Sequence, residues 1–351
     1  MPINNRSVEY WEKRFEDILI SSEKLGVDYE KELAKIYEET KLALERELEA
    51  FYARYALETG LDLAEVKKRL DSKQLKRFKT EQKIYLDKVN KLIEQGADLE
   101  SYANTLKRLS ARAYVSKLQE LQNNLNTLIV LLTGEQEVKL GQLLGAGYLE
   151  AYFKTTFELQ KGLGFGMSFT QPATETVEKT LKTAWNGNNY SSSIWKNKQQ
   201  LTNWLNTNLP RHFAAGSSIK EMSKDLAEKL NTNYNNAVRL VRTEVNYISN
   251  QATMDSYKNS GVVDKFKILA TLDSRTSEIC REMDGKVFNV SESQVSVNTP
   301  PFHVRCRTTT VPYFDDDDRE GLERAARDES GKTYYVPADI TYKEWQDKYR
   351  K

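Results

Sequence analysis

The spacing of apolar residues in the first 165 residues is helical. Between Leu33 and Tyr55, apolar side chains recur three, four or seven positions apart with Glu and Lys between them, which places them on one face of a helix. No proline occurs from Glu9 to about Gly134, and the commonest residues there lose little entropy in a helix. We therefore predict an elongated helical docking region over residues 1–165.

A stricter repeat lies inside this region. Six apolar residues follow one another at spacings of 4, 3, 4, 3 and 4: Tyr114, Leu118, Leu121, Leu125, Leu128 and Leu132. This spacing is typical of a coiled-coil seam. Because such a long apolar stripe is unfavourable in water, the seam predicts a partner helix from the same chain or from another subunit.

The composition changes after a glycine-rich stretch at residues 162–166. Its glycines follow a helical pattern rather than a strand, so they predict a hinge and not a phosphate-binding loop. Beyond it, short helical segments alternate with three runs of strand character, at 266–272, 287–288 and 308–311. We predict a small α+β domain over residues 166–314. An extended tail over 315–351 is expected to start at the acidic run Asp315 to Asp318, with Trp345 and Tyr349 as anchors.

Composition excludes several classes of protein. The 52 Lys and Arg nearly balance the 51 Asp and Glu, so the chain is not a globally basic nucleic-acid binder. Two cysteines cannot form a secreted disulfide scaffold, which favours a reducing compartment with thiol or metal chemistry. The first residues lack the apolar core of a signal peptide, and no apolar run approaches the ~20 residues that span a bilayer. We expect a soluble protein of the cell interior or of a particle, with no membrane partner.

Positive charge is concentrated in one segment, here called the basic stripe. Its seven basic residues are accompanied by a single acidic residue, Asp71, and they are Lys67, Lys68, Arg69, Lys73, Lys76, Arg77 and Lys79. Such a stripe can neutralise DNA phosphates or contact an acidic protein surface. An ordinary solvated helix face is the alternative interpretation, since no base-reading motif accompanies the charges.

The residues best suited to chemistry lie between Asp273 and Arg307. His303 and Cys306 have the short spacing by which one turn presents two ligands to a tetrahedral ion, and Cys280 supplies a third. We predict a zinc site from these residues, with Asp273 as the fourth ligand; Asp284 or a water is the alternative. The other interpretation is that both thiols are small buried apolar groups and His303 is a hydrogen-bonded core residue.

The same cluster has the residue types of a nucleophile, a base and an orienting acid. Residue types alone do not define such a triad, because geometry does, so no catalytic residue is assigned.

A polar bracket is a further prediction. Arg242 and Glu244 lie on a helix predicted over 234–257 and project about 200° apart, so they cannot easily pair with each other. Asp273 and Arg275, at the end of a predicted strand, are the expected partners. An ordinary solvated face is again the alternative.

The motif Asp273-x-Arg275-Thr276-x3-Cys280-x3-Asp284-Gly285-x2-Phe288, followed by Pro300-Pro301-x-His303-x2-Cys306-Arg307, resembles the C-terminal signature of phage head morphogenesis proteins, the Mu-F-like minor capsid proteins. Three other segments are similar to the same family: Tyr10-Trp11-x-Lys13-Arg14, Trp185-x-Gly187-x2-Tyr190-Ser191-x3-Trp195, and Arg242-Thr243-Glu244. The chain departs from many relatives at Thr308, where they have a second cysteine, which puts a four-thiolate or Cys3His site in doubt.

The resemblance implies a non-enzymatic minor protein of a tailed-phage head. It implies a position inside the virion near the portal vertex, host cytoplasm during assembly, and a role in head assembly and in DNA packaging or ejection. The expected partners are the portal protein, the major capsid or scaffold protein, and packaged double-stranded DNA. Two rival functions use the residues above. One is a metal-dependent hydrolase or nuclease at Cys280, His303 and Cys306, and the other is a DNA-binding module acting through the basic stripe.

Overall fold

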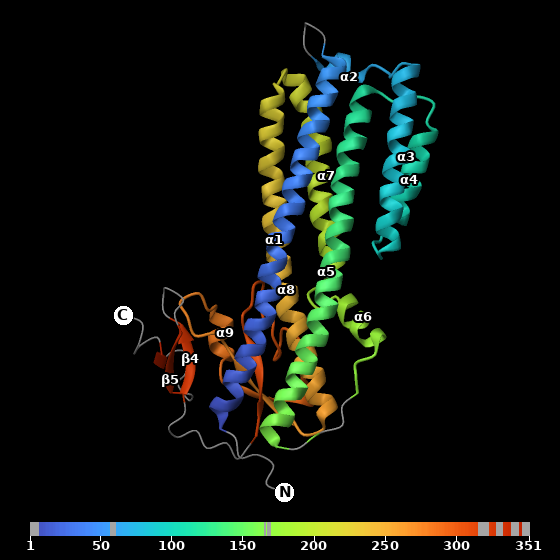
Figure 1. Ribbon diagram of the computed structural model, residues 1–351. Coiled ribbons are helices and arrows are strands. Elements are labelled where there is room, and N and C mark those ends of the chain that lie inside the picture. Colours follow the sequence, from blue (N-terminus) through green and yellow to red (C-terminus); the bar gives the residue numbers. More distant parts are fainter. Residues whose placement is uncertain are drawn as a thin grey trace. The chain divides into compact units, whose positions relative to one another are not determined.

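The computed structural model describes residues 7–56, 61–164, 166, 170–314, 323–327, 333–337 and 344–345. It is mainly helical, with a small antiparallel sheet toward the C-terminus (Figure 1), so the predicted fold class is confirmed. The helices in the described part are α1 (Val8–Tyr55), α2 (Leu63–Lys67), α3 (Ser72–Glu94), α4 (Glu100–Ala111), α5 (Lys117–Leu163), α6 (Thr174–Lys182), α7 (Tyr190–Ala215), α8 (Ile219–Ser260) and α9 (Glu278–Met283). None of the helices so described is long and apolar enough to cross a membrane.

The chain forms two compact units that interleave along the sequence. The sheet unit comprises Met1–Tyr29, Gln142–Asn189 and Arg239–Lys351, and the helical unit comprises Glu30–Gly141 and Tyr190–Val238. This division differs from the predicted boundary near residue 165, because residues on both sides of that position belong to the sheet unit. The physical reason is that α1, α5 and α8 each contribute residues to both units, so no single chain position separates them.

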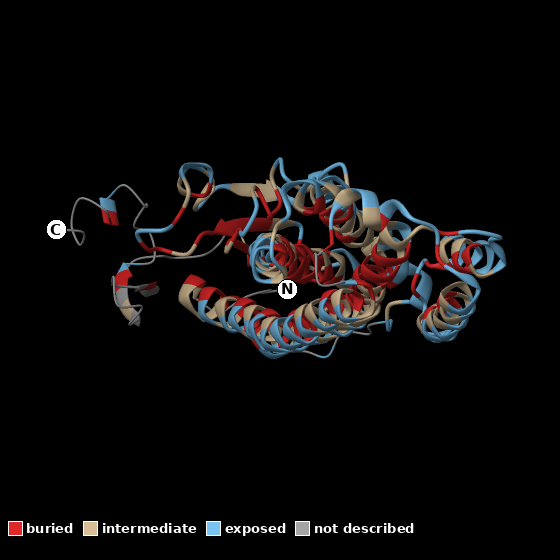
Figure 2. Ribbon diagram, turned by 90° about the horizontal axis from the view of Figure 1, so that it is seen from above, coloured by how far each residue is buried: buried red, intermediate tan, exposed pale blue. Residues whose placement is uncertain are grey.

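Side-chain caps precede α2 and α3, two of the shorter helices of the helical unit. The Asp62 carboxylate accepts from the backbone N–H of Glu65 at the start of α2. Asp71 and Gln74 form a reciprocal capping box that starts α3, which satisfies two otherwise unpaired N–H groups. Along the helices, buried and exposed residues alternate around each axis (Figure 2), as amphipathic periodicity predicts.

The predicted seam is only partly buried. Leu121, Leu125 and Leu132 of α5 are buried, whereas Leu118 and Leu128 are half-buried. Tyr114 is 60% exposed, which corrects its place in the seam. The reason is local: Ser116 and Gln119 exchange side-chain to backbone hydrogen bonds, a capping box that begins the helix after Tyr114.

The sheet unit contains a three-stranded antiparallel sheet of order β2–β1–β3, built from β1 (Lys265–Leu269), β2 (Val287–Asn289) and β3 (Thr309–Tyr313). In the centre, Phe266 pairs with Phe288 of β2 and with Pro312 of β3. Helix α8 contacts the start of β3 through two hydrogen bonds, because the side-chain amides of Asn246 and Asn250 both donate to the carbonyl of Thr308. The three strands lie close to the runs of strand character predicted at 266–272, 287–288 and 308–311.

Several buried polar side chains in the sheet unit are paired with one another. Lys267 of β1 is buried and forms an ion pair with Glu12 of α1. Hydroxyl groups of α1 and α5 form hydrogen bonds with hydroxyl groups of α8. The pairs are Ser22 with Ser249, Thr155 with Thr253, and Thr156 with Ser256. Such pairing offsets the cost of removing these groups from water.

Two short strands lie within the segment predicted as an extended tail. Strands β4 (Glu323–Arg327) and β5 (Thr333–Pro337) pair antiparallel. Ala326, Val336 and Trp345 pack with Leu272 in one apolar cluster, and the indole N–H of Trp345 donates to the Tyr334 hydroxyl at 2.6 Å. Trp345 therefore acts as an anchor, whereas Asp315 to Asp318 and Tyr349 lie outside the described residues.

Candidate functional site

Three side chains with metal-binding atoms are brought together by α9 and by the turn before β3. Ser277 caps α9 by accepting from the backbone N–H of Cys280. On the other side, the N–H of Cys306 donates to the carbonyl of His303, which closes the turn that carries both residues. Arg305 sits in that turn with φ of 60°, and its N–H donates to Thr243 Oγ1 on α8 at 3.0 Å.

The ligand atoms of this cluster lie close together. The Sγ atoms of Cys280 and Cys306 are 3.7 Å apart, and Cys280 Sγ lies 3.1 Å from His303 Nε2. All three ligand atoms lie within 4.8 Å of one another. Both cysteines are buried. The structure therefore brings together Cys280, His303 and Cys306 from segments more than twenty residues apart in sequence.

The orientation of His303 is fixed by its backbone contact. Its Nδ1 lies 2.8 Å from the carbonyl oxygen of Val304, so Nδ1 carries the proton and donates it there. In the neutral ring, Nε2 is then left with a lone pair, and it faces Cys280 Sγ and the Ser277 hydroxyl, which is 2.7 Å away. A backbone acceptor on the distal nitrogen is the usual support of a metal-binding histidine.

The two thiols differ in acidity. The hydrogen bond that Cys280 donates to Cys306 lowers the pKa of Cys306 and raises the pKa of Cys280. The hydrogen bond between His303 and Cys306 raises the pKa of His303. Cys306 is therefore the more readily ionised thiol.

Asp273 lies apart from this cluster, contrary to its predicted role as fourth ligand. Its two carboxylate oxygens accept from the guanidinium of Arg307 at 2.5 and 2.7 Å, and one also accepts from the backbone N–H of Arg275 at 2.9 Å. Burial alone would raise the pKa of Asp273, but the hydrogen bonds and charge of Arg307 lower it to about 2. Asp284 is also engaged elsewhere, since its carboxylate accepts from the N–H of Ala270.

The predicted polar bracket is divided between two places. Glu244 is buried and accepts from the indole N–H of Trp185 at 3.4 Å, and the Trp185 ring stacks on Tyr247 with centroids 5.1 Å apart. Arg242 lines a cavity together with Arg275. Burial raises the pKa of Glu244 to about 7, and the hydrogen bond from Trp185 offsets this only in part.

Glu244→Gln is expected to stabilise the protein at pH 8 by about 2 to 3 kcal/mol. The unfolded carboxyl loses its proton near pH 4.5 and the folded one near pH 7, so the free energy of unfolding falls as pH rises between these values. The variant lacks this fall. Urea unfolding at pH 4 to 8 measures the difference, with the exposed carboxylate variant Glu282→Gln as control. If the free energy of unfolding of the wild type does not fall between pH 4.5 and 7 relative to that of Glu244→Gln, the raised pKa of Glu244 is contradicted.

A cavity of about 470 Å³ opens beside the cluster. Its lining includes His303 and Cys306, four arginines and one acidic residue: Arg242, Arg275, Arg305, Arg307 and Glu23.

The sequence analysis assigned no role to Ser277, although a serine directly before a helical segment is a common N-cap. It also missed the pairing of Arg307 with Asp273, which no local spacing reveals.

The basic stripe is only partly available as a surface. Lys67, Lys68, Arg69, Lys73 and Lys76 are exposed, and Lys79 is half-buried. Two of the exposed groups have local partners, since Lys68 pairs with Glu65 at 2.5 Å and Arg69 lies over the Tyr114 ring. The stripe therefore has less unopposed charge than its sequence suggests.

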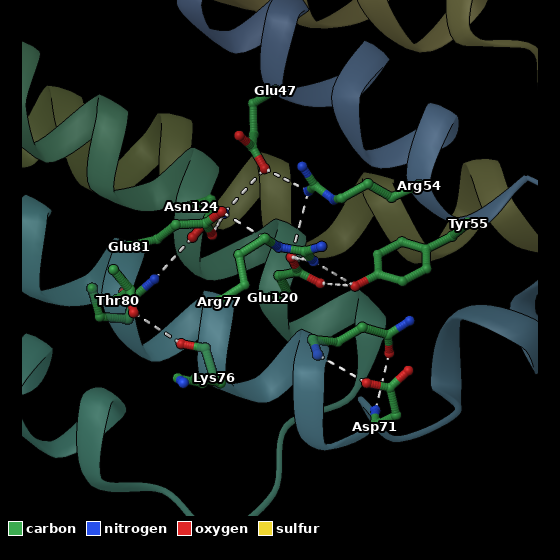
Figure 3. Close-up of polar contacts among 12 residues, drawn as sticks. Glu47, Arg54, Tyr55, Asp71, Lys76, Arg77, Thr80, Glu81, Glu120 and Asn124 are labelled. Carbon is green, nitrogen blue, oxygen red and sulfur yellow. Dashed lines mark hydrogen bonds and ion pairs between the residues drawn. The ribbon is translucent and has the colours of Figure 1, made fainter.

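Arg77 points into the helical unit. It donates to Glu120, which is fully buried, at 2.7 Å, and Glu120 also accepts from the Tyr55 hydroxyl at 2.6 Å (Figure 3). Arg54 lies 3.4 Å from the same carboxylate. The prediction that Arg77 is a DNA or portal contact is corrected, because its charge is used to balance a buried carboxylate.

Arg77→Met is expected to lower the free energy of unfolding by about 2 kcal/mol, because Glu120 loses one of its two cationic partners while buried. Lys76→Met, at the neighbouring exposed position, is the matched control and should change stability by less than about 0.5 kcal/mol. Chemical denaturation of both variants measures the difference. Equal stabilities would show that Arg77 is an ordinary surface residue.

The geometry above places a turn with one histidine and one cysteine against α8, immediately before β3. Residues 203–311 match the model of the family described as Phage Mu protein F like protein, which contains the whole cluster and confirms the family resemblance for this part of the chain. The segments around Tyr10 and Trp185 lie outside the matched range.

Two curated relatives extend the comparison. The chain is 22% identical over 299 residues to the minor head protein GP7 of Bacillus phage SPP1, a match that covers 81% of this chain and 92% of that protein. It is 23% identical over 239 residues to the NAD(+)--arginine ADP-ribosyltransferase EFV of Enterococcus faecalis (strain ATCC 700802 / V583). That second match covers 64% of this chain and about half, 49%, of the relative. No solved structure matches the chain significantly.

Proposed function

We propose that this protein is a minor structural component of a tailed-phage head, that it docks at the portal vertex inside the head, and that it assists assembly and DNA packaging or ejection. The observation that carries the proposal is the match to a minor head protein along 92% of that protein's length. The Mu-F match over 203–311 supports it independently of full-length similarity. In this proposal the chain is in the host cytoplasm during assembly and in the virion afterwards.

The exposed part of the basic stripe is the proposed contact surface. Lys67, Lys73 and Lys76 are exposed on or beside α2 and α3 of the helical unit. Exposed ammonium groups favour an anionic partner, which in a head is the packaged duplex or an acidic face of the portal. Capsid and scaffold proteins remain proposed partners through the family resemblance alone.

Charge reversal tests this surface. The triple variant Lys67→Glu, Lys73→Glu, Lys76→Glu is expected to weaken association with portal protein or duplex DNA at least tenfold in low salt and much less in high salt, where screening already weakens it. Light scattering or fluorescence anisotropy at two salt concentrations measures the effect. Reversal of Lys179 and Lys182 on α6 is the control. Unchanged binding to both partners at low ionic strength would identify the stripe as a solvated face.

A structural role, rather than catalysis, is part of the proposal. The relative named as an ADP-ribosyltransferase shares about half of its length with this chain, and its activity is a property of that protein. The decisive assay incubates the purified chain with NAD⁺ and, separately, with DNA and divalent cations. Turnover that is lost on His303→Ala in a folded protein would favour the enzyme.

A further inference from the structure

We propose that Cys280, His303 and Cys306 bind one zinc ion, and that a water molecule from the adjacent cavity completes its coordination. This proposal concerns the chemistry of three side chains and is independent of the proposed role in a phage head. Nothing in the match to a minor head protein assigns a metal to this segment.

The donor set suits zinc. Two thiolates and one imidazole are ligands that favour Zn²⁺ over the hard cations Mg²⁺ and Ca²⁺. With Zn–S bonds of about 2.3 Å and tetrahedral angles, two thiolates on one ion lie about 3.8 Å apart. The observed Sγ to Sγ distance of 3.7 Å fits this requirement, and His303 Nε2 lies 3.1 Å from Cys280 Sγ and within 4.8 Å of Cys306 Sγ.

The surroundings prepare each ligand for an ion. The Nδ1–H of His303 donates to the Val304 carbonyl, which leaves Nε2 free to coordinate. The Cys280 and Cys306 thiols already contact each other, and an ion bound between them displaces their protons.

We assign the fourth coordination position to water. Among the described residues, the group of His, Cys, Asp and Glu ligand atoms at this place consists of these three alone. His303 and Cys306 both line the cavity of about 470 Å³. Water therefore has access to the ion from that side, an arrangement with three protein ligands and one exchangeable position.

The ion would connect two segments that are far apart in the sequence. It would join α9 to the turn before β3, across a separation of 26 residues. Because the unfolded chain does not preform such a site, the free energy of binding adds directly to the stability of the fold.

Metal content of the full-length protein is the first test. Purified under reducing conditions without added chelator, the wild type is expected to contain about one zinc per chain by elemental analysis. Cys280→Ser and Cys306→Ser are expected to lose it. His212→Asn is the matched control, because it removes the other histidine, which contacts Ser217 and Asp225 instead, and it should keep the zinc. Wild-type zinc no higher than that of the cysteine variants would overturn the proposal.

Two measurements on the wild type avoid the risk that cysteine variants fail to fold. Chelation should lower the melting temperature, and added zinc should restore it. Replacement with Co²⁺ should give a thiolate-to-cobalt charge-transfer band and the intense visible bands of four coordination, and azide should change those bands if the fourth ligand is water. A Cys280–Cys306 disulfide in the reduced preparation, an unchanged melting temperature, or a cobalt spectrum without the thiolate band would overturn the site. A spectrum unaffected by azide would overturn the open position.

Discussion

Replacing Leu121 and Leu125 together with aspartate is expected to unfold the helical unit. Both side chains are fully buried on α5, and removing one buried leucine side chain costs about 2 to 5 kcal/mol. Each aspartate adds the cost of a carboxylate without a partner in an apolar environment. The total exceeds the stability of most domains, so circular dichroism should show a large loss of helix and the protein should aggregate.

The matched control is on the same helix with the same spacing. Gln142 and Ala146 are four residues apart on α5 and both are exposed. The double variant Gln142→Asp, Ala146→Asp introduces the same charges and should remain folded, with a change of about 1 kcal/mol or less. Soluble, fully helical protein from the Leu121 and Leu125 double variant would show that this face is not a core.

Asp273→Ala is expected to destabilise the sheet unit by about 3 kcal/mol, because it leaves the Arg307 guanidinium without the carboxylate that it contacts through two hydrogen bonds. Arg307 is partly exposed, with a side-chain exposure of 24%, so solvent reduces the loss below that of a fully buried pair. Thermal or urea unfolding at pH 7 measures it. Asp264→Ala, at an exposed carboxylate just before β1, is the control.

The same pair predicts a specific acid response. The folded pKa of Asp273 is lowered from 3.8 to about 2, so its contribution is present above pH 4 and is lost as pH falls toward 2. The loss amounts to about 2 kcal/mol. The Asp273→Ala variant should lack this component, and parallel acid profiles for wild type and variant would contradict the ion pair.

Local sequence patterns predicted the elements that are set by helix or strand periodicity and by turn residues. The apolar periodicity near Leu33 to Tyr55 predicted part of α1, and the β-branched run at 308–311 predicted β3 within about two residues. Residue spacing placed His303 and Cys306 on one turn. These features depend on the period of a helix or strand and on caps, which a short window of sequence contains.

The features that were missed depend on partners far along the chain. In the sequence, Arg77 belongs to a run of basic residues. In the structure it donates to the buried carboxylate of Glu120, 43 residues later. The sequence predicts Asp273 as a metal ligand, whereas in the structure both of its carboxylate oxygens accept hydrogen bonds from Arg307. The division into two units differs from a boundary near residue 165 for a similar reason, because α5 carries residues of both units on one continuous helix. These features depend on contacts between residues far apart in the sequence, and the spacing of neighbouring residues does not reveal such contacts.

The proposed role at the portal vertex is tested most directly by the amount of this chain in purified heads assembled with and without the portal protein. Quantitative mass spectrometry of heads produced from the phage structural genes supplies the number. We expect a few copies per head when the portal is present and a loss of at least tenfold when it is omitted. Absence from portal-containing heads, or an amount that does not depend on the portal, would contradict the proposed role at the portal vertex.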